Sequence, residues 1–328
     1  MQTFLKVLLA VTCAAGSVLM TPAATAAEGD DYPRRSVRFL SPNAPGSAND
    51  TLGRLLTVKL GEMLGQSVYI ENQAGAAGLI GTEMAKNAAP DGYTILSGSS
   101  AGISISPHLH KRPPYDSLND FVYVSMFAVL PNLLVVNPSL PVKTVQELID
   151  YCKSRPGQIN MASAGPGSQS HLAGAMLTMA GKFEALHVPY KGGGPSVLSV
   201  MTGESQWTIT PAPAAAGHVR SGKLRALAHS LPQRSALLPD LPAVAETIPG
   251  FSYSAWNGLL LPKGTPKVVA DKVRAALIKA VNVPEIKDAI NKQGAEIVTN
   301  TPEEFRELVR AEFENTGKVM KAIGLKVD

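Results

Sequence analysis

The stretch QINMASAGPGSQSHLAGAMLTMAG, residues 158–181, decides the fold class. Its opening, up to Gly165, is a short run of small and apolar residues typical of a buried strand. The residues from Ser168 onward predict a helix, and the glycines between the two segments let the backbone turn tightly. A strand that turns directly into a helix is the repeating unit of α/β proteins.

The same order of elements recurs on both sides of this stretch. Further apolar runs predict strands at residues 36–42, 67–72, 93–98, 121–130, 132–138, 186–192 and 205–210. Segments with helical spacing predict helices at residues 52–65, 78–89, 142–157, 195–203, 265–282 and 301–324. Residues 218–230 predict a short helix and then a strand. Alternation of this kind predicts parallel sheets with helices on both faces.

These strands are too many for one sheet, so we predict two sheets in two lobes. Candidate crossovers between the lobes lie near Pro131–Pro138 and near Phe251–Gly258, and the C-terminal helices return to the first lobe. The predicted domains are therefore residues 32–133 plus 255–328 (domain I) and residues 134–254 (domain II). The fold class is α/β, with each lobe a mixed sheet flanked by helices.

Residues 1–26 have the features of a secretory signal peptide. A positive start at Lys6 precedes an apolar run from Val7 to Met20, and Ala24-x-Ala26 fits a cleavage site. The run is too short for a comfortable transmembrane helix. We therefore predict an exported, soluble mature protein. Cys152 is the one cysteine left after cleavage, and it lies in a helical pattern that suggests a buried structural thiol.

The composition and net charge indicate which kinds of ligand or macromolecule the protein binds. Of the 328 residues, 45% are hydrophobic and 17% are charged, so there is enough apolar material for real cores and extensive disorder is not expected. The net charge of +4 fits an anionic ligand, and it fits ordinary surface charge equally well. Because the sequence contains no run of Lys and Arg interleaved with aromatics, we predict no nucleic-acid partner.

Three glycine-rich loops carry the strongest chemical signal. They are Pro42–Asp50, Asn72–Gly81 and Ser163–His171, and each lies between a predicted strand and a predicted helix. Backbone N–H groups at such a turn, together with the N-terminus of the following helix, bind carboxylate or phosphate without a cationic side chain. Ligands of open α/β sheets bind at this edge, where the strands end.

The same loops also have a purely structural interpretation. Glycine-rich turns are common in α/β folds, and the polar residues Asn49, Asp50, Ser168 and Ser170 suit helix N-caps. Three such loops in one chain, two of them with Ser or Asn, favour anion binding.

Two enzyme-like patterns compete with a binding function. Gly98-Ser-Ser100-Ala-Gly102 matches the nucleophile elbow of serine hydrolases, but the Pro-rich residues 103–116 have no helical period where that motif requires a helix. We therefore interpret Ser99 and Ser100 as part of a small-residue loop that lines a cleft. His108-x-His110 has no accompanying Cys, Asp or Glu cluster, and the sequence has no phosphate-binding Gly-x-x-x-x-Gly-Lys motif, so we expect no metal and no cofactor.

In order and spacing, these segments resemble the periplasmic solute-binding proteins of tripartite tricarboxylate transporters, the Bug family. The resemblance covers nearly the whole mature chain. Its motifs are PGSAND (45–50), ENQAGAAGLIG (71–81), PDGYTIL (90–96), PYDSLNDF (114–121), ASAGPGSQSHLA (162–173), HVPYKGGGP (187–195), GKLRALA (222–228), RSALLPDLPAVAE (234–246) and WNGLLLPKGTP (256–266).

The resemblance implies a two-lobed, periplasmic-binding-protein-like (Venus flytrap) fold that closes on a carboxylate, and it implies a membrane transporter as partner. The family's first loop falls on Gly46, Ser47, Asn49 and Asp50, and its second falls on Ser163, Gly165, Gly167, Ser168 and His171. Both sets coincide with loops chosen above on physical grounds.

Two positions depart from the family pattern. Asn43 stands where an aromatic is common, and Thr210 stands where a strand commonly ends in Phe-Asp. The absence of an acid at Thr210 would suit a ligand without an amino group or one with a larger apolar body.

We therefore predict a periplasmic protein, monomeric and not an enzyme, that captures a small organic carboxylate. A ligand-sensing receptor of the same fold and a secreted serine hydrolase using Ser100 are the alternatives. The predicted ligand-binding residues are Gly46, Ser47, Ala48, Asn49, Asp50, Ser99, Ser100, Ser163, Gly165, Gly167, Ser168, His171 and Thr210.

Overall fold

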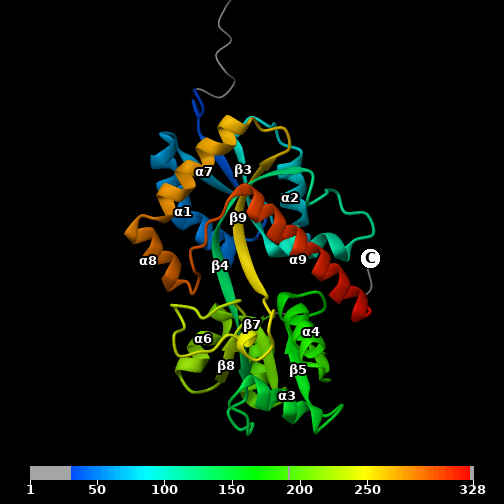
Figure 1. Cartoon of the computed structure of the whole chain (residues 1–328). Coiled ribbons are helices and arrows are strands. Elements are labelled where there is room, and N and C mark those ends of the chain that lie inside the picture. Colours follow the sequence, from blue (N-terminus) through cyan, green and yellow to red (C-terminus); the bar gives the residue numbers. More distant parts are fainter. Residues whose placement is uncertain (1–30, 191–192, 326–328) are drawn as a thin grey trace, which may run out of the picture.

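The computed structural model describes residues 31–190 and 193–325 and has two lobes, one above the other in Figure 1. The predicted signal peptide, residues 1–26, lies outside the described residues. Among the helices of the described part, none combines the length and the apolar character needed to cross a bilayer.

Lobe I contains the amino-terminal strands and the carboxy-terminal helices. Its sheet has the order β2 (Val68–Asn72), β1 (Val37–Ser41), β3 (Thr94–Ser99), β9 (Ser254–Pro262) and β4 (Phe121–Val136). Strand β1 pairs in parallel with β2 and β3, whereas β9 runs antiparallel to both of its neighbours. The carboxyl ends of β1, β2 and β3 therefore lie at one edge of the sheet.

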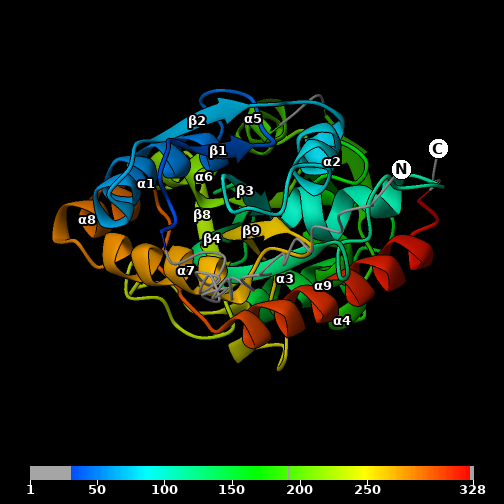
Figure 2. The ribbon, with the colours of Figure 1, turned by 90° about the horizontal axis from the view of Figure 1, so that it is seen from above.

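Alternating apolar residues explain why helices cover both faces of this sheet. Phe39, Ile95 and Leu259 belong to one hydrophobic cluster, while the next residue of each strand belongs to another. The first cluster packs against α1 (Ala48–Leu64), α7 (Lys267–Val281) and α8 (Pro284–Lys292). The second packs against α2 (Leu79–Lys86) and α9 (Pro302–Ala322). Figure 2 shows these two groups on opposite sides of the strands.

Lobe II repeats the design with the remaining elements. Its sheet has the order β6 (Leu186–Pro189), β5 (Asn160–Ser163), β7 (Trp207–Pro211), β4 and β8 (Arg225–His229). Helices α3 (Val145–Lys153) and α4 (Gln169–Gly181) pack on one face. Helices α5 (Gly193–Thr202) and α6 (Ala212–Arg220) pack on the other.

Strand β4 belongs to both sheets, which corrects the prediction of two separate strands at 121–130 and 132–138. It runs without a break for 16 residues. Its pairing with β9 ends at Pro131, and its pairing with β7 begins at Asn132. Proline has no N–H to donate to a ladder, so it is tolerated where the strand changes partners.

Helix α9 also reaches both lobes. A capping box at Thr301 starts it, and Pro302 follows as its first residue. Its early residues Phe305 and Val309 lie in the core of lobe I, whereas Val319 and Met320 lie in the core of lobe II. In Figure 1 this helix slopes from lobe I to a position beside α4.

We expect Gly258→Ala to lower the free energy of unfolding by about 1–3 kcal/mol, the usual cost of overpacking a core. A Cβ atom at Gly258 would lie 2.4 Å from Cζ of Phe305. That ring has no room to move, because it packs edge-on against Tyr123 and Trp256. Chemical denaturation measures the change.

Gly217→Ala is the matched control, because a Cβ atom there meets no atom within 4 Å and the residue lies in helix α6. It should stabilise the protein by about 0.5–1 kcal/mol. Equal stability of Gly258→Ala and the wild type would contradict the close packing of Phe305 on β9.

Candidate functional site

The glycine-rich loops of both lobes follow the carboxyl ends of strands, and the two lobes touch next to the second loop. The loop before α1 follows β1, and the loop before α4 follows β5. Across the gap, the side-chain amide of Gln169 donates a 2.9 Å hydrogen bond to Oγ of Ser100, the residue after β3. A Cβ atom at Gly167 would lie 3.0 Å from Leu109. Lobe I and lobe II are thus in direct contact at the carboxyl ends of their strands.

The first loop ends in a well-defined helix cap. Ser47 is the N-cap of α1, and its side chain accepts a hydrogen bond from the N–H of Asp50. The N–H of Thr51 donates to the carbonyl of Ser47. The first-turn donors of Ala48 and Asn49 are left without an acceptor among the described residues.

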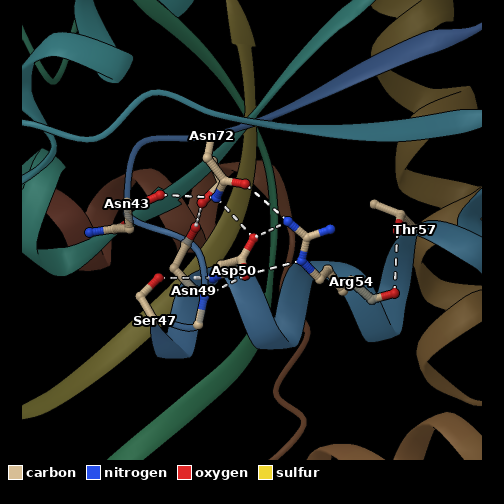
Figure 3. Close-up of polar contacts among 9 residues, drawn as sticks. Asn43, Ser47, Asn49, Asp50, Arg54, Thr57 and Asn72 are labelled. Atoms are coloured by element: carbon tan, nitrogen blue, oxygen red, sulfur yellow. Dashed lines mark hydrogen bonds and ion pairs between the residues drawn. The ribbon is translucent and has the colours of Figure 1, made fainter.

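Asp50 holds the loop in place. As Figure 3 shows, its carboxylate lies among Arg54, Asn72 and the loop, and it accepts hydrogen bonds from both side chains and from the N–H of Gly46 at 2.8 Å. Burial by itself would raise the pKa of the Asp50 carboxyl. The hydrogen bonds from Arg54, Gly46 and Asn72 outweigh it, so the pKa lies below its ordinary value. The Asp50 side chain therefore holds the loop in place, and its negative charge gives it no role in binding an anion directly.

Asn49 is also occupied internally. Its side-chain oxygen accepts from Ser41, and its amide donates to the carbonyl of Ser97 and to the side chain of Asn257 at 2.7 Å. These bonds join α1 to strands β1, β3 and β9. The neighbouring Asn43 differs, because its side-chain oxygen is buried and has no partner in the described part of the chain.

The second loop repeats the cap of the first. Ser168 is the N-cap of α4, and its side chain accepts from the N–H of His171. The N–H of Leu172 donates to the carbonyl of Ser168. The N–H groups of Gln169 and Ser170 are again the first-turn donors without an acceptor among the residues described.

Glycine is needed twice in this loop. Gly165 has φ of +117° and Gly167 has φ of +72°, conformations that side-chain-bearing residues rarely adopt. Ser168 closes the turn by donating a 2.6 Å hydrogen bond to the carbonyl of Gly165. The fully buried Ser163 accepts from the N–H of Gly165 and lies 2.6 Å from Nε2 of His187.

The side chain of His171 holds the second loop by a hydrogen bond to its backbone. Its Nδ1 accepts a 3.1 Å hydrogen bond from the N–H of Gly167, so the ring is neutral. It stacks on His187 with the ring centroids 3.8 Å apart. Burial, and next the neighbouring His187, lower the pKa of His171 to about 4. Burial likewise lowers the pKa of His187.

The remaining predicted residues lie at the same strand ends. The side-chain oxygen of Ser99 accepts from the N–H of Gly102, and Thr210 lies buried near the end of β7, paired with Leu133 of β4. Because β5 and β7 are parallel, Thr210 shares the edge that carries Ser163.

The segment after Ser100 is helical, contrary to expectation. A π-helical turn at Ala101–Ile105 and a 3₁₀ turn at Ser106–Leu109 replace the predicted loop, held by hydrogen bonds from Ser117 and Tyr115 to its carbonyl groups. The partner of Ser100 is the amide of Gln169, a donor that cannot act as the base of a hydrolase.

Sequence reasoning missed Gln169, Asn72 and His187 as parts of this site. Gln169 directly follows the N-cap Ser168, so the sequence places it in the first turn of a helix that starts at a strand end. That position could have identified it as a residue of the site. Nothing local in the sequence marks Asn72 or His187, because their partners Asp50 and Ser163 lie 22 and 24 residues away.

Comparison with known proteins agrees with this architecture. Residues 52–325 match the family described as tripartite tricarboxylate transporter family receptor. The chain is similar to the protein BugT of Bordetella pertussis, with 36% identity over 300 residues, 91% of this chain and 92% of BugT.

Two solved structures with bound acids are also similar. The R. palustris protein Rpa4515 with adipate has 30% identity and a TM-score of 0.74, covering 90% of this chain and 99% of the other. MatC from Rhodopseudomonas palustris with bound malate has 30% identity and a TM-score of 0.70, covering 88% and 99%.

Replacing Asp50 by Asn should destabilise the protein by about 1–3 kcal/mol, because the new amide would face donors from Gly46, Arg54 or Asn72. Denaturation of the variant measures the loss. Asp271→Asn is the control, since that acid forms an exposed pair with Lys267 worth at most about 1 kcal/mol. Similar losses in the two variants would argue against a structural role for Asp50.

The histidine pair predicts a loss of stability in acid. A histidine whose folded pKa is depressed binds its proton more readily when unfolded, so its contribution to stability is lost as the pH falls from 6.5 towards about 4. His171→Asn keeps an acceptor for the N–H of Gly167 and removes the titration. Over this window its free energy of unfolding should depend less on pH, by up to about 1.4 kcal/mol per pH unit.

Parallel profiles for His171→Asn and the wild type would mean that His171 does not titrate in this window.

Proposed function

This chain belongs to the tripartite tricarboxylate transporter receptor family, and we propose that it captures a small organic carboxylate between its lobes and delivers it to a membrane transporter. Members of this family are solute-binding proteins rather than enzymes. Two similar structures hold adipate and malate, both small dicarboxylates, which supports a ligand of the same class.

The observation that carries the proposal is the matched pair of helix N-termini. Helices α1 and α4 each leave two first-turn N–H groups without an acceptor among the described residues, and each follows a glycine-rich turn at a strand end. The partial positive charge of a helix N-terminus favours an anion. Because the two helices come from different lobes, a dicarboxylate would bridge them.

The contacts would be made mainly by the backbone. We expect the N–H groups of Ala48 and Asn49 in lobe I and of Gln169 and Ser170 in lobe II to face the ligand, because they have no acceptor among the described residues. Asp50, His171 and the side chain of Asn49 would act indirectly, because their hydrogen bonds hold these loops. Ser99, Ser100 and Thr210 lie at the same edges and would shape the rest of the site.

Binding would involve closure of the two lobes. The moving bodies in this proposal are residues 32–133 plus 255–328 and residues 134–254, and the change of partners along β4 supports that division. The hydrogen bond between Gln169 and Ser100 joins the bodies directly and would stabilise the closed arrangement. A ligand drives closure only through its higher affinity for the closed state.

We further propose that residues 1–26 direct export and are then removed, so that the protein acts in the periplasm. The positive start, apolar run and Ala-x-Ala site support this assignment. A similar solved structure, 35% identical, is described as that of a periplasmic transporter.

A thermal-shift screen of the mature protein against organic acids, with adipate and malate included, tests the function. An acid at about 100 times its dissociation constant should stabilise the protein by about 2.7 kcal/mol. Refolding from denaturant first removes any ligand acquired during expression. A refolded protein that responds to no acid in a broad panel would refute carboxylate binding.

The closure contact is tested with the acid found in that screen. Gln169→Ala should weaken its binding by about 2- to 10-fold, the value of one lost hydrogen bond, as measured by calorimetry. Gln146→Ala is the control, because Gln146 lies in the first turn of another lobe II helix and bonds Asp150 at the surface. Unchanged affinity in Gln169→Ala would mean that the contact plays no part in binding.

A further inference from the structure

A pocket lies beside α9, where the two lobes adjoin. It has a volume of about 370 Å³, within the range of small-molecule sites. The middle of α9 and the start of β9 form most of its wall, and Met176 of α4 adds a contribution from lobe II. None of its lining residues belongs to the predicted carboxylate-binding set.

Glu312 of α9 gives this pocket its charge. One carboxylate oxygen, Oε2, accepts hydrogen bonds from Ser104 at 2.7 Å and from the indole N–H of Trp256. The other oxygen, Oε1, has no hydrogen-bond partner among the described residues, and it is not among the fully buried atoms that lack one. It is therefore the oxygen available to a molecule in the pocket.

No cation of the described chain pairs with this carboxyl group. None of the ion pairs there includes Glu312. The titratable groups that interact with it are the buried phenols of Tyr123 and Tyr253. Burial outweighs the two hydrogen bonds and raises the pKa of Glu312 to about 7. A cationic group on a ligand would stabilise the ionised form of this carboxyl group.

The other groups around the pocket suit an organic cation. Asn315 and Thr316 supply further oxygens, and an ammonium group has three N–H donors to satisfy. Met176 and Leu308 offer apolar contact to a hydrocarbon body.

We propose that this pocket binds a small organic ammonium ion, with its charged group on Glu312 and its hydrocarbon part against Met176 and Leu308. Because the pocket shares no lining residue with the predicted carboxylate site, the proposal does not depend on the function proposed above.

Calorimetric titration with benzylammonium at pH 6 and pH 8 tests the proposal. The probe stays protonated over this range, whereas Glu312 ionises, so the affinity should rise by about tenfold from pH 6 to pH 8. Glu312→Gln should bind at least about tenfold more weakly at pH 8 and show no such rise. The variant keeps an oxygen that accepts from Ser104 and Trp256, so the helix remains tied to its neighbours.

Glu314→Gln is the matched control, since it removes an exposed acid from the same helix and should bind as the wild type does. Equal binding by Glu312→Gln and the wild type would overturn the proposal, as would absence of binding to the wild type. Tighter binding of neutral benzyl alcohol at pH 6 than of benzylammonium at pH 8 would also overturn it, because the pocket would then serve a hydrogen-bond acceptor.

The position of the probe is measured on the wild type, which makes the test independent of how the variants fold. With methionine methyl groups labelled for NMR, benzylammonium should shift the Met176 resonance through its ring current. Met320, buried in the core of lobe II, should not respond. An unmoved Met176 signal at saturating probe would place the ligand elsewhere and refute the site.

Discussion

A single strand shared by two sheets is the constraint on which the rest of the structure depends. Because β4 passes from one sheet to the other without a break, both lobes are built on the same backbone. The alternation of its side chains then feeds cores on both faces of each sheet, as Leu133 and Leu134 do in lobe II. Strand ends of the two sheets are brought close together, as the hydrogen bond from Gln169 of lobe II to Ser100 of lobe I shows.

The same helix-capping arrangement occurs in both lobes at the candidate site. In each lobe an N-cap serine takes the third N–H of its helix, so that two donors remain at the helix terminus. The charged and titratable side chains nearby are occupied in holding the loops: Asp50 with Arg54, and His171 with Gly167. Main-chain donors of this kind recognise a carboxylate but say little about the rest of the ligand.

Local sequence patterns predicted the strand–turn–helix units, the two lobes and the glycine-rich turns at the strand ends. They did not predict that β4 is one strand, because Pro131 reads as a break and only its position at the change of partners explains it. The hydrogen-bond and stacking partners of Asn49 and His171 were equally hidden. Asn49 bonds Asn257, a residue 208 positions away, and His171 stacks on a ring from the next strand. Such partners are set by tertiary contacts and leave no mark in a local pattern.

Helix α9 has a further consequence for how the molecule moves. A rigid helix anchored by Val309 in one core and by Val319 in the other ties the lobes together at a point away from the strand crossovers. A wide opening would expose Val319 and Met320 to water, at about 1.5–3 kcal/mol for each side chain. The movement of one lobe relative to the other on ligand binding should thus be small. It should follow directions that keep Val319 and Met320 buried. A membrane partner that distinguishes the two forms would have to detect local changes at the cleft edge rather than a large change in overall shape.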